Sequence, residues 1–325
     1  MSFRLHFDEP FGRQVGALAM VQLTRAIDGL RTPEAHGVDH TVHDVRVRLK
    51  RVRGLLRLAR PAMDGGYGSA NAELRDAARD LSALRDAHAL IGTFDDLVRA
   101  SHVDRVDRAA VDAIRCGLAT RASRAVGEEA VSIRLRRAAE RLESVRDRIP
   151  AWRFDDDPAL LVAGVTDTYG RGRAAFRASA RSPGDARLHE WRKRAKYGWQ
   201  QAHLLTGLAP SVIEPMAVSL KELADALGDD HDLAVLRWTL RSSPEEAGIA
   251  MADVLAALDA VRADLQDRSL RLGARVYAEP PRAFGRRIGR YRTAWDRFGA
   301  ERSTGEISAL ARDASDRPPR AAAVS

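Results

Sequence analysis

The feature that most constrains the fold of this chain is a basic segment that occurs twice. Residues 43–50 read HDVRVRLK, and residues 189–196 read HEWRKRAK, 146 positions later. Each copy contains a histidine, an acid directly after it and a run of basic residues in the same order. A repeat that keeps its charges as well as its apolar positions predicts two similar structural units that present the same surface.

The repeat continues far beyond this segment. The offset of 146 aligns similar residues without a gap from residue 25 to residue 90, and after one inserted residue the alignment continues. We infer two similar helical bundles related by a pseudo-twofold axis and joined by a linker near residues 150–158. The aligned pairs include Arg25 with Arg171, Arg31 with Arg177, Arg75 with Lys221, Leu81 with Leu227, Asp86 with Asp232, and, at an offset of 147, Arg115 with Arg262, Leu118 with Leu265, Arg121 with Arg268 and Arg124 with Arg271.

Nearly all segments between prolines and glycines have the composition of helices. Ala, Leu, Val and Arg dominate, and aromatic residues make up only 6% of the chain, which favours helix over strand. Thr41 is a suitable N-cap for the helix that carries the first basic segment. We therefore predict an all-α fold with bundles over residues 3–150 and 156–299, and a disordered or weakly helical tail over 300–325. The predicted helices cover residues 10–31, 41–60, 70–99, 105–149, 159–180, 186–206, 212–240, 245–275 and 282–298.

The two basic helices each carry an apolar stripe and a basic ladder beside it. Residues three and four positions apart lie on one face of a helix, and the next residue along the chain is rotated by about 100°. We expect Arg48 and Arg51 to lie on another side, in solvent. The predicted buried stripes are Val42, Val45, Leu49, Val52 and Leu56, and Leu188, Trp191, Ala195, Gly198 and Ala202. The ladders are His43, Arg46, Lys50, Arg53 and Arg57, and His189, Arg192, Lys196, Trp199 and His203.

The ladders have two interpretations. Like charges at i,i+4 destabilise a helix by a few tenths of a kcal/mol per pair, and residues 41–60 contain seven Arg or Lys and only one acid. For one isolated helix, a solvated face is the simpler interpretation. The same basic positions return in the second half, although packing gives no reason to retain them. Their return favours a surface that binds a polyanion.

The histidines and the acidic run leave several roles open. A histidine at the start of a helix can be a cap or a satisfied buried group, or it can donate to an anion with help from the helix dipole. Residues 229–232 (DDHD) superficially resemble the His-Asp pairs of metal phosphohydrolases, but further ligands lack a recognisable spacing. We expect this run to cap or turn a helix after Gly228, and no catalytic motif is present.

The remaining composition narrows the class of protein. The net charge is +8, from 53 basic and 45 acidic residues. No apolar stretch approaches the length of a membrane span, and the N-terminus lacks the apolar segment of a secretory signal. The single cysteine, Cys116, excludes an intramolecular disulfide and a cysteine metal cluster, and we expect it to be buried in its helix. We therefore predict a cytoplasmic protein that has no membrane partner.

Taken together, these motifs resemble the CHAD (conserved histidine α-helical domain) family, over residues 3 to 299. The resemblance rests on the two basic helices, Leu84-Arg85-Asp86, Leu227-Gly228-x-x-x-Asp232 and the segment Leu272 to Phe284. It implies two pseudo-twofold-related four-helix bundles around a basic central cavity, and binding of inorganic polyphosphate, in some members at polyphosphate granules. The family's basic and histidine positions correspond to Arg25, His43, Arg46, Lys50, Arg75, Arg171, His189, Arg192, Lys196 and Lys221.

Two departures bear on function. His88 stands where the family often has a second acid, and the Glu-x-Glu-x-Lys strand of the neighbouring triphosphate-tunnel (CYTH) domain does not occur. We therefore expect a stand-alone, non-catalytic polyphosphate-binding protein without a cofactor or metal. Its expected partners are polyphosphate and polyphosphate-metabolising enzymes or granule proteins. The alternatives are a nucleic-acid-binding protein, a metal-dependent phosphohydrolase, and a structural protein whose charge reflects genome composition. The repeat adds Arg53, Arg121, Arg124, Arg268 and Arg271 to the predicted binding residues.

Overall fold

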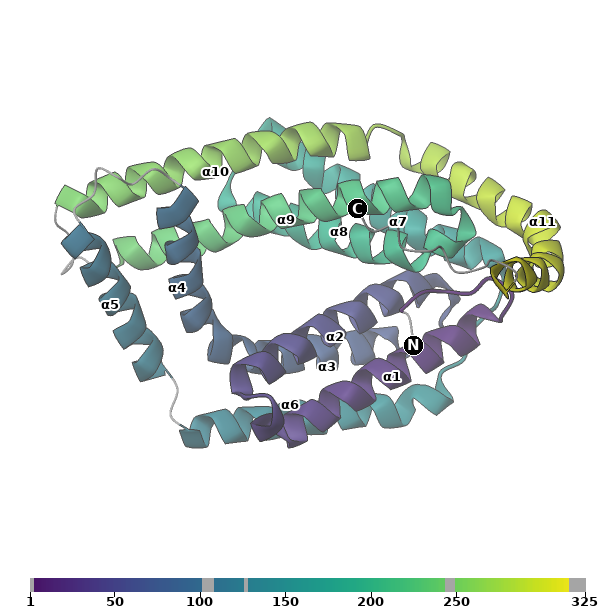
Figure 1. Cartoon of the computed structure of the whole chain (residues 1–325), viewed down its shortest axis with the longest axis horizontal. Coiled ribbons are helices and arrows are strands. Elements are labelled where there is room, and N and C mark those ends of the chain that lie inside the picture. The colour runs from purple at the N-terminus through teal and green to yellow at the C-terminus, as the bar shows by residue number, and fades with distance from the viewer. Residues whose placement is uncertain (1–2, 101–107, 126–127, 243–248, 316–325) are drawn as a thin grey trace, which may run out of the picture.

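The described part of the computed structural model is built from helices (Figure 1), which confirms the all-α prediction. The described residues are 3–100, 108–125, 128–242 and 249–315. Within these ranges only the backbone is described for residues 83–89, 100, 122–125, 128–129, 249–250 and 300–315. Four single 3₁₀ turns and one isolated bridge, Met63 to Phe154, accompany the α-helices in these residues. The α-helices are α1 (Phe11–Arg31), α2 (Val38–Ala59), α3 (Tyr67–Asp80), α4 (Ser82–Ala100), α5 (Arg108–Ala125), α6 (Glu128–Arg148), α7 (Pro158–Arg181), α8 (Asp185–Leu204), α9 (Pro210–Arg241), α10 (Ile249–Val276) and α11 (Pro281–Ser315).

Two of the predicted helices are wrong in their extent, because each is divided in the structure. The predicted helix 70–99 breaks at Leu81 into α3 and α4, and the predicted helix 105–149 is α5 and α6. No proline or glycine marks Leu81. The break is tertiary in origin, since α3 packs on α2 and α6 while α4 packs on α5 and α9. The aligned region of the second half stays one helix, α9.

The described apolar residues form two cores, and each contains residues from both halves of the sequence. The main core joins α1, α2, α3 and α6 to α7, α8, α11 and the first part of α9. The second core joins α4 and α5 to the end of α9 and the start of α10, at the left of Figure 1. The packing units therefore combine helices that the sequence places in different halves. The internal duplication and the predicted domain boundaries remain predictions.

Close contacts hold the two halves together where α2 meets α7 and α8. A Cβ atom added to Gly164 of α7 would lie 2.0 Å from the backbone oxygen of Leu58 in α2. A Cβ atom added to Gly54 of α2 would lie 2.3 Å from Oε1 of Gln200 in α8. Gly54 and Gln200 are 146 positions apart, which is the offset of the predicted repeat. Gly164 has no room for a side chain because it meets the backbone of Leu58, whereas a side chain at position 54 would require Gln200 to move.

Gly164→Ala should therefore lower the free energy of unfolding by about 3 kcal/mol, since α2 and α7 must separate to admit the methyl group. Gly92 in α4 is the control, because a Cβ atom there meets nothing within 4 Å. Gly92→Ala should leave stability unchanged or raise it by up to about 1 kcal/mol. Urea unfolding followed by circular dichroism measures both variants. Equal midpoints for Gly164→Ala and the wild type would contradict the close contact.

The N-terminal segment before α1 is attached to the second half of the chain. Phe3, Leu5 and Phe7 are buried, and the Leu5 N–H donates to the oxygen of Leu204 at the end of α8, at 3.1 Å. Buried and exposed side chains alternate along residues 3–7, as expected for an extended segment. This segment places Phe3 in the main core.

Helix α5 gives a correction to the sequence analysis. Cys116 is exposed and not buried, as had been expected. The reason is that α5 lies at one end of the molecule and buries only the side of Ile114 and Leu118. Cys116 lies midway between these two positions, so it faces away from the core.

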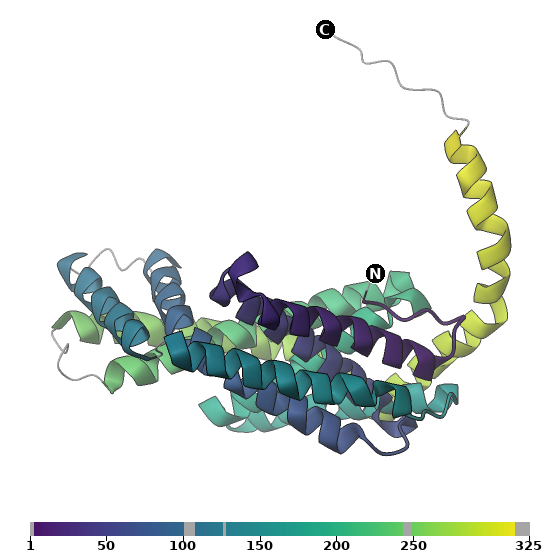
Figure 2. The same ribbon diagram turned by 90° about the horizontal axis from the view of Figure 1, so that it is seen from below.

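Helix α11 continues to Ser315 and extends away from the body of the molecule (Figure 2). The part of the predicted tail up to Ser315 is therefore helical, and residues 316–325 lie outside the described residues. Within the described ranges, no helix combines the length and apolar character needed to cross a membrane.

Candidate functional site

The two basic helices bury the apolar stripes that the sequence predicts. All five stripe positions of α2 are buried, from Val42 to Leu56. In α8, four of the five positions are buried and Gly198 is partly exposed. The burial of these stripes fixes which way the neighbouring basic ladders point.

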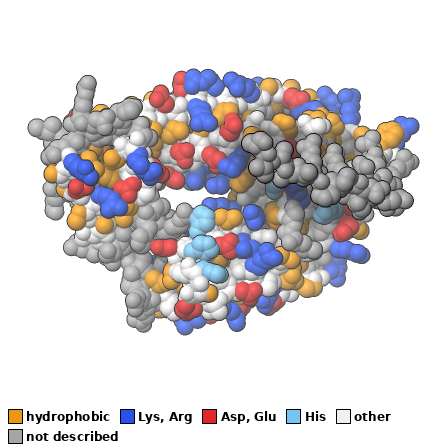
Figure 3. Space-filling model, in the orientation of Figure 1, with side chains coloured by type: hydrophobic (Ala, Val, Ile, Leu, Met, Phe, Trp, Pro, Cys, Tyr) orange, Lys and Arg blue, Asp and Glu red, His pale blue; other side chains and the backbone are white. Residues whose placement is uncertain are grey.

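A pocket of about 630 Å³ lies between α2, α8, α9 and the N-terminal segment. Lys50 comes from the first basic helix and Lys196 is its aligned partner in the second. Figure 3 shows a hollow between the two parts of the molecule, bordered by Lys and Arg side chains together with acidic and histidine side chains. The pocket is lined by Phe3, His43, Val47, Lys50, Arg51, Lys196, Trp199, Gln200, His203, Lys221 and Asp225.

Lys196 lies where the two basic ladders approach each other. Burial lowers the pKa of its ammonium group, and the positive charges of Arg192 and Arg46 lower it further, while Asp225 and Asp232 act in the opposite direction. Arg192 is 3.9 Å from Asp232, and its buried Nε has no hydrogen-bond partner within the described part of the chain. Arg46 and Arg192 therefore add positive potential around the pocket.

His189 forms a pair with His231 of α9, at 3.2 Å between their Nδ1 atoms. Burial, and then the nearby positive groups, lowers the pKa of His189 to about 4, and burial also lowers the pKa of His231. Burial and the neighbouring positive groups therefore favour the neutral form of His189 in the protein without a ligand. One imidazole donates to the other, and both are neutral at pH 7.

The starts of α2 and α8 also require corrections. Helix α2 begins at Val38 after Gly37, so Thr41 is not its N-cap but a buried residue inside the helix. His43 and His189 both lie in the second turn of their helices and not at the N-terminus. The helix dipole acts mainly within the first turn, so the proposed help from the dipole does not apply.

The acidic run 229–232 neither caps nor turns a helix, because α9 continues through it. Successive helical residues point about 100° apart. Asp225, Asp229 and Asp232 accordingly form an acidic ladder beside the cations, with Asp225 2.5 Å from Lys221. Burial raises the pKa of Asp229, and Asp232 and Asp225 raise it further. Asp230 points the other way and is buried.

Several of the predicted binding residues do not line this pocket. Arg53 donates to Asn71, and Arg268 lies near enough to influence the pKa of Asp229. Arg25 and Arg121 are exposed on α1 and α5. The side chain of Arg124 lies outside the described residues. Arg75, Arg171 and Arg271 are exposed and paired with Asp76, Asp167 and Asp267. Whether these residues bind a ligand stays a prediction.

The structure also identifies pocket residues that the predicted site omits. Trp199 and His203 continue the ladder of α8, so the sequence contained a signal for them. Phe3 had no such signal, because tertiary folding alone brings it to α8. Arg51 is exposed, as expected, and it also borders the pocket. Arg48 was also expected in solvent, but its side chain is only 17% exposed and pairs with Asp44.

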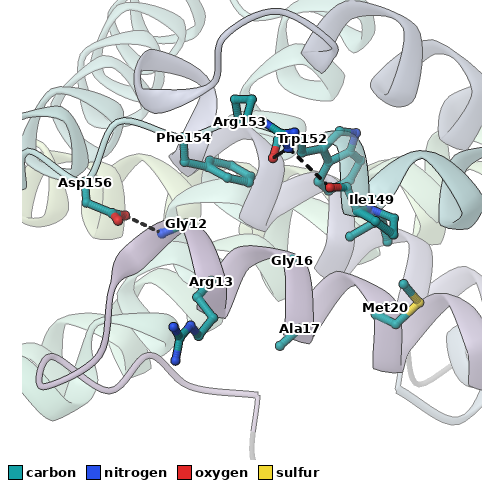
Figure 4. A pocket seen from close by; sticks show the side chains of 11 residues that line it. Gly12, Arg13, Gly16, Ala17, Met20, Ile149, Trp152, Arg153, Phe154 and Asp156 are labelled. Carbon is teal, nitrogen blue, oxygen red and sulfur yellow. Dashed lines mark hydrogen bonds between the residues drawn. The ribbon is translucent and has the colours of Figure 1, made fainter.

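A second pocket, of about 470 Å³, lies between α1 and the linker that follows α6 (Figure 4). Its polar groups are largely engaged within the protein. Asp156 accepts the N–H of Gly12 at 2.7 Å, and Arg153 donates to the oxygens of Pro150 and Trp152. The pocket between α2, α8 and α9 is therefore the stronger candidate for an anion. No group of three or more His, Cys, Asp or Glu in the described ranges could hold a metal ion.

Comparisons with known proteins identify similar chains. A family model described as CHAD domain matches residues 21–241. A crystal structure of the CHAD domain from the plant Ricinus communis is 18% identical and covers 85% of this chain and 94% of its own, with a TM-score of 0.58. PptA from Streptomyces chartreusis is 16% identical and covers 83% of this chain and 98% of its own, with a TM-score of 0.55. No curated protein matches the sequence.

Proposed function

Because the chain belongs to the CHAD domain family, we propose that it binds inorganic polyphosphate in the pocket between α2, α8 and α9, without cleaving it. The observation that carries this proposal is the meeting of Lys50 and Lys196, from the two basic helices, in one pocket together with Lys221. A linear polyanion can contact both helices at once. Association with polyphosphate granules and their proteins is part of the same proposal.

The electrostatics of the pocket favour an anion. Hydrogen bonds between ammonium groups and phosphate oxygens are charge-assisted and stronger than neutral ones. Burial and neighbouring cations destabilise the charged form of Lys196, and a bound phosphate would reverse this effect. Asp225 and Asp232 act as internal counterions that the ligand must displace. The net affinity therefore depends on several linked phosphates acting together.

The affinity for long-chain polyphosphate should fall about 50-fold between about 50 and 200 mM salt. This estimate takes three to four phosphate contacts and the counterion release known for nucleic acids. The affinity should also rise with chain length, since linked phosphates bind multivalently. Calorimetric titrations with orthophosphate, tripolyphosphate and long-chain polyphosphate measure both trends.

Equal affinity for all three ligands would contradict the proposal. Competition with RNA at fixed salt separates it from the nucleic-acid-binding alternative, because RNA should displace polyphosphate only weakly. Phosphate release in the presence of Mg²⁺ or Mn²⁺ would instead favour the phosphohydrolase.

A further inference from the structure

The pocket between α2, α8 and α9 contains more than a phosphate chain requires. Lys50, Lys196 and Lys221 supply positive charge, whereas Trp199 and Phe3 supply aromatic surface to the same pocket. Inorganic polyphosphate has no group that binds an aromatic ring. The aromatic part of the lining therefore indicates a ligand with a second chemical component.

Trp199 is partly buried against the main core and also lines the pocket. The ammonium nitrogen of Lys221 lies over the Trp199 ring, 5.9 Å from its centroid, so a cation lies next to an aromatic face. Phe3 lines the pocket next to Arg51, whose guanidinium lies 5.8 Å from the Phe3 ring. Adjacent cations and aromatic rings are the combination that binds a phosphate and stacks its base.

Polar groups suited to the edge of a base lie beside Trp199. Gln200 is 7% exposed and lines the pocket, while its Oε1 is buried against Gly54 of α2. Its amide nitrogen is therefore the group that can donate to a base. Burial, followed by Arg4 and Arg51, lowers the pKa of His203, so its imidazole is neutral at pH 7 and can also donate and accept.

We propose that this pocket binds a nucleoside polyphosphate, with the phosphates on Lys50, Lys196 and Lys221 and the base against Trp199. The phosphate part rests on the function proposed above, and the base part is new. The pocket volume of about 630 Å³ lies within the range of small-molecule sites. The aromatic surface of the pocket acquires a role in this complex.

The test compares ATP with inorganic tripolyphosphate on the full chain at constant ionic strength. Tripolyphosphate has the same number of phosphates and no base, so electrostatics alone does not favour ATP. ATP should bind about 10-fold more tightly, because stacking on an aromatic side chain contributes a factor of about 5 to 150. ATP should also change the fluorescence of the protein, since Trp199 is in the pocket.

Trp199→Leu should lower ATP affinity about 10-fold and leave the affinities for tripolyphosphate and long-chain polyphosphate within about twofold. Trp199→Phe, which keeps an aromatic face, should retain most of the ATP affinity and shows that the site tolerates substitution. Trp238→Leu is the control, because Trp238 is 71% exposed on α9 and does not line the pocket. The Trp238→Leu variant should keep the wild-type affinity for ATP and the ATP-dependent change in fluorescence.

Equal affinities of ATP and tripolyphosphate for the wild type would overturn the inference. The inference would also be overturned if Trp199→Leu lowered the affinities for ATP and tripolyphosphate by the same factor. In either case, tight binding of long-chain polyphosphate would leave the proposed function standing. If polyphosphate failed to bind while ATP bound through Trp199, the proposed function would fail on its own.

Discussion

The double variant Lys50→Glu/Lys196→Glu should bind long-chain polyphosphate at least about 100-fold more weakly than the wild type. Each substitution removes a charge-assisted hydrogen bond of about 1.5–3 kcal/mol and adds repulsion. Two such losses correspond to a factor of 100 or more. The effect should be large because these residues line one pocket from both basic helices. Titration at physiological ionic strength measures it, and circular dichroism verifies that the variant is folded.

The matched control is Arg99→Glu/Arg136→Glu, which changes the net charge by the same amount. The side chains of Arg99 and Arg136 are 75% and 67% exposed on α4 and α6, away from the pocket lining. Exposed charges farther away than a Debye length are largely screened. Their reversal should therefore alter affinity less than about threefold. A loss as large as that of the lysine variant would show that net charge, and not the pocket, determines binding.

Asp230→Ala should lower the free energy of unfolding by about 3–5 kcal/mol, the range for removing one partner of a buried ion pair. The side chains of Asp230 and Arg262 are 2% and 8% exposed, and the Asp230 carboxylate accepts from Arg262 Nε at 3.0 Å and from Gln266 at 2.8 Å. Without Asp230, Asp185, at 2.6 Å and with its side chain 64% exposed, is the acidic partner that the guanidinium keeps among the described residues. The free-energy cost of burying the charged Arg262 guanidinium is then poorly compensated.

Asp259→Ala is the control for this prediction. Asp259 joins the same two helices, α9 and α10, through Arg237, but their side chains are 43% and 28% exposed. Exposed ion pairs contribute only about 0–1 kcal/mol. Denaturant unfolding measured for both variants should separate them by more than about 2 kcal/mol. Similar values would contradict the assignment of Asp230 and Arg262 as a buried pair.

The helices and their buried faces were predictable because both depend on neighbours within four residues. The spacing of Val42, Val45 and Leu49 predicted a buried stripe, and these residues are buried. The break at Leu81 could not be predicted, since no local residue causes it. The exposure of Cys116 depends on the position of α5 at the end of the molecule, which local periodicity does not contain.

Some residues of the candidate site were likewise predictable from the sequence, and others were not. Lys50 and Lys196 were predicted as aligned members of two basic ladders, and the tertiary structure places them in one pocket. Arg171 and Arg271 had equal support from the repeat, yet they are exposed and paired with aspartates of their own helices. The repeat predicts which face of its helix a side chain occupies, but it does not predict which neighbouring helix that face meets.

By itself, the sequence determined that the chain is helical, which stripes are buried and that two similar helices carry basic ladders. These properties follow from the 3.6-residue period and from local side-chain chemistry. Only the tertiary structure decided that Lys221, Trp199 and Phe3 join Lys50 and Lys196 around one pocket, and that Asp230 is buried while Asp229 faces the cations. The physical reason is that a pocket is formed by residues distant in sequence, whose approach depends on how whole helices pack.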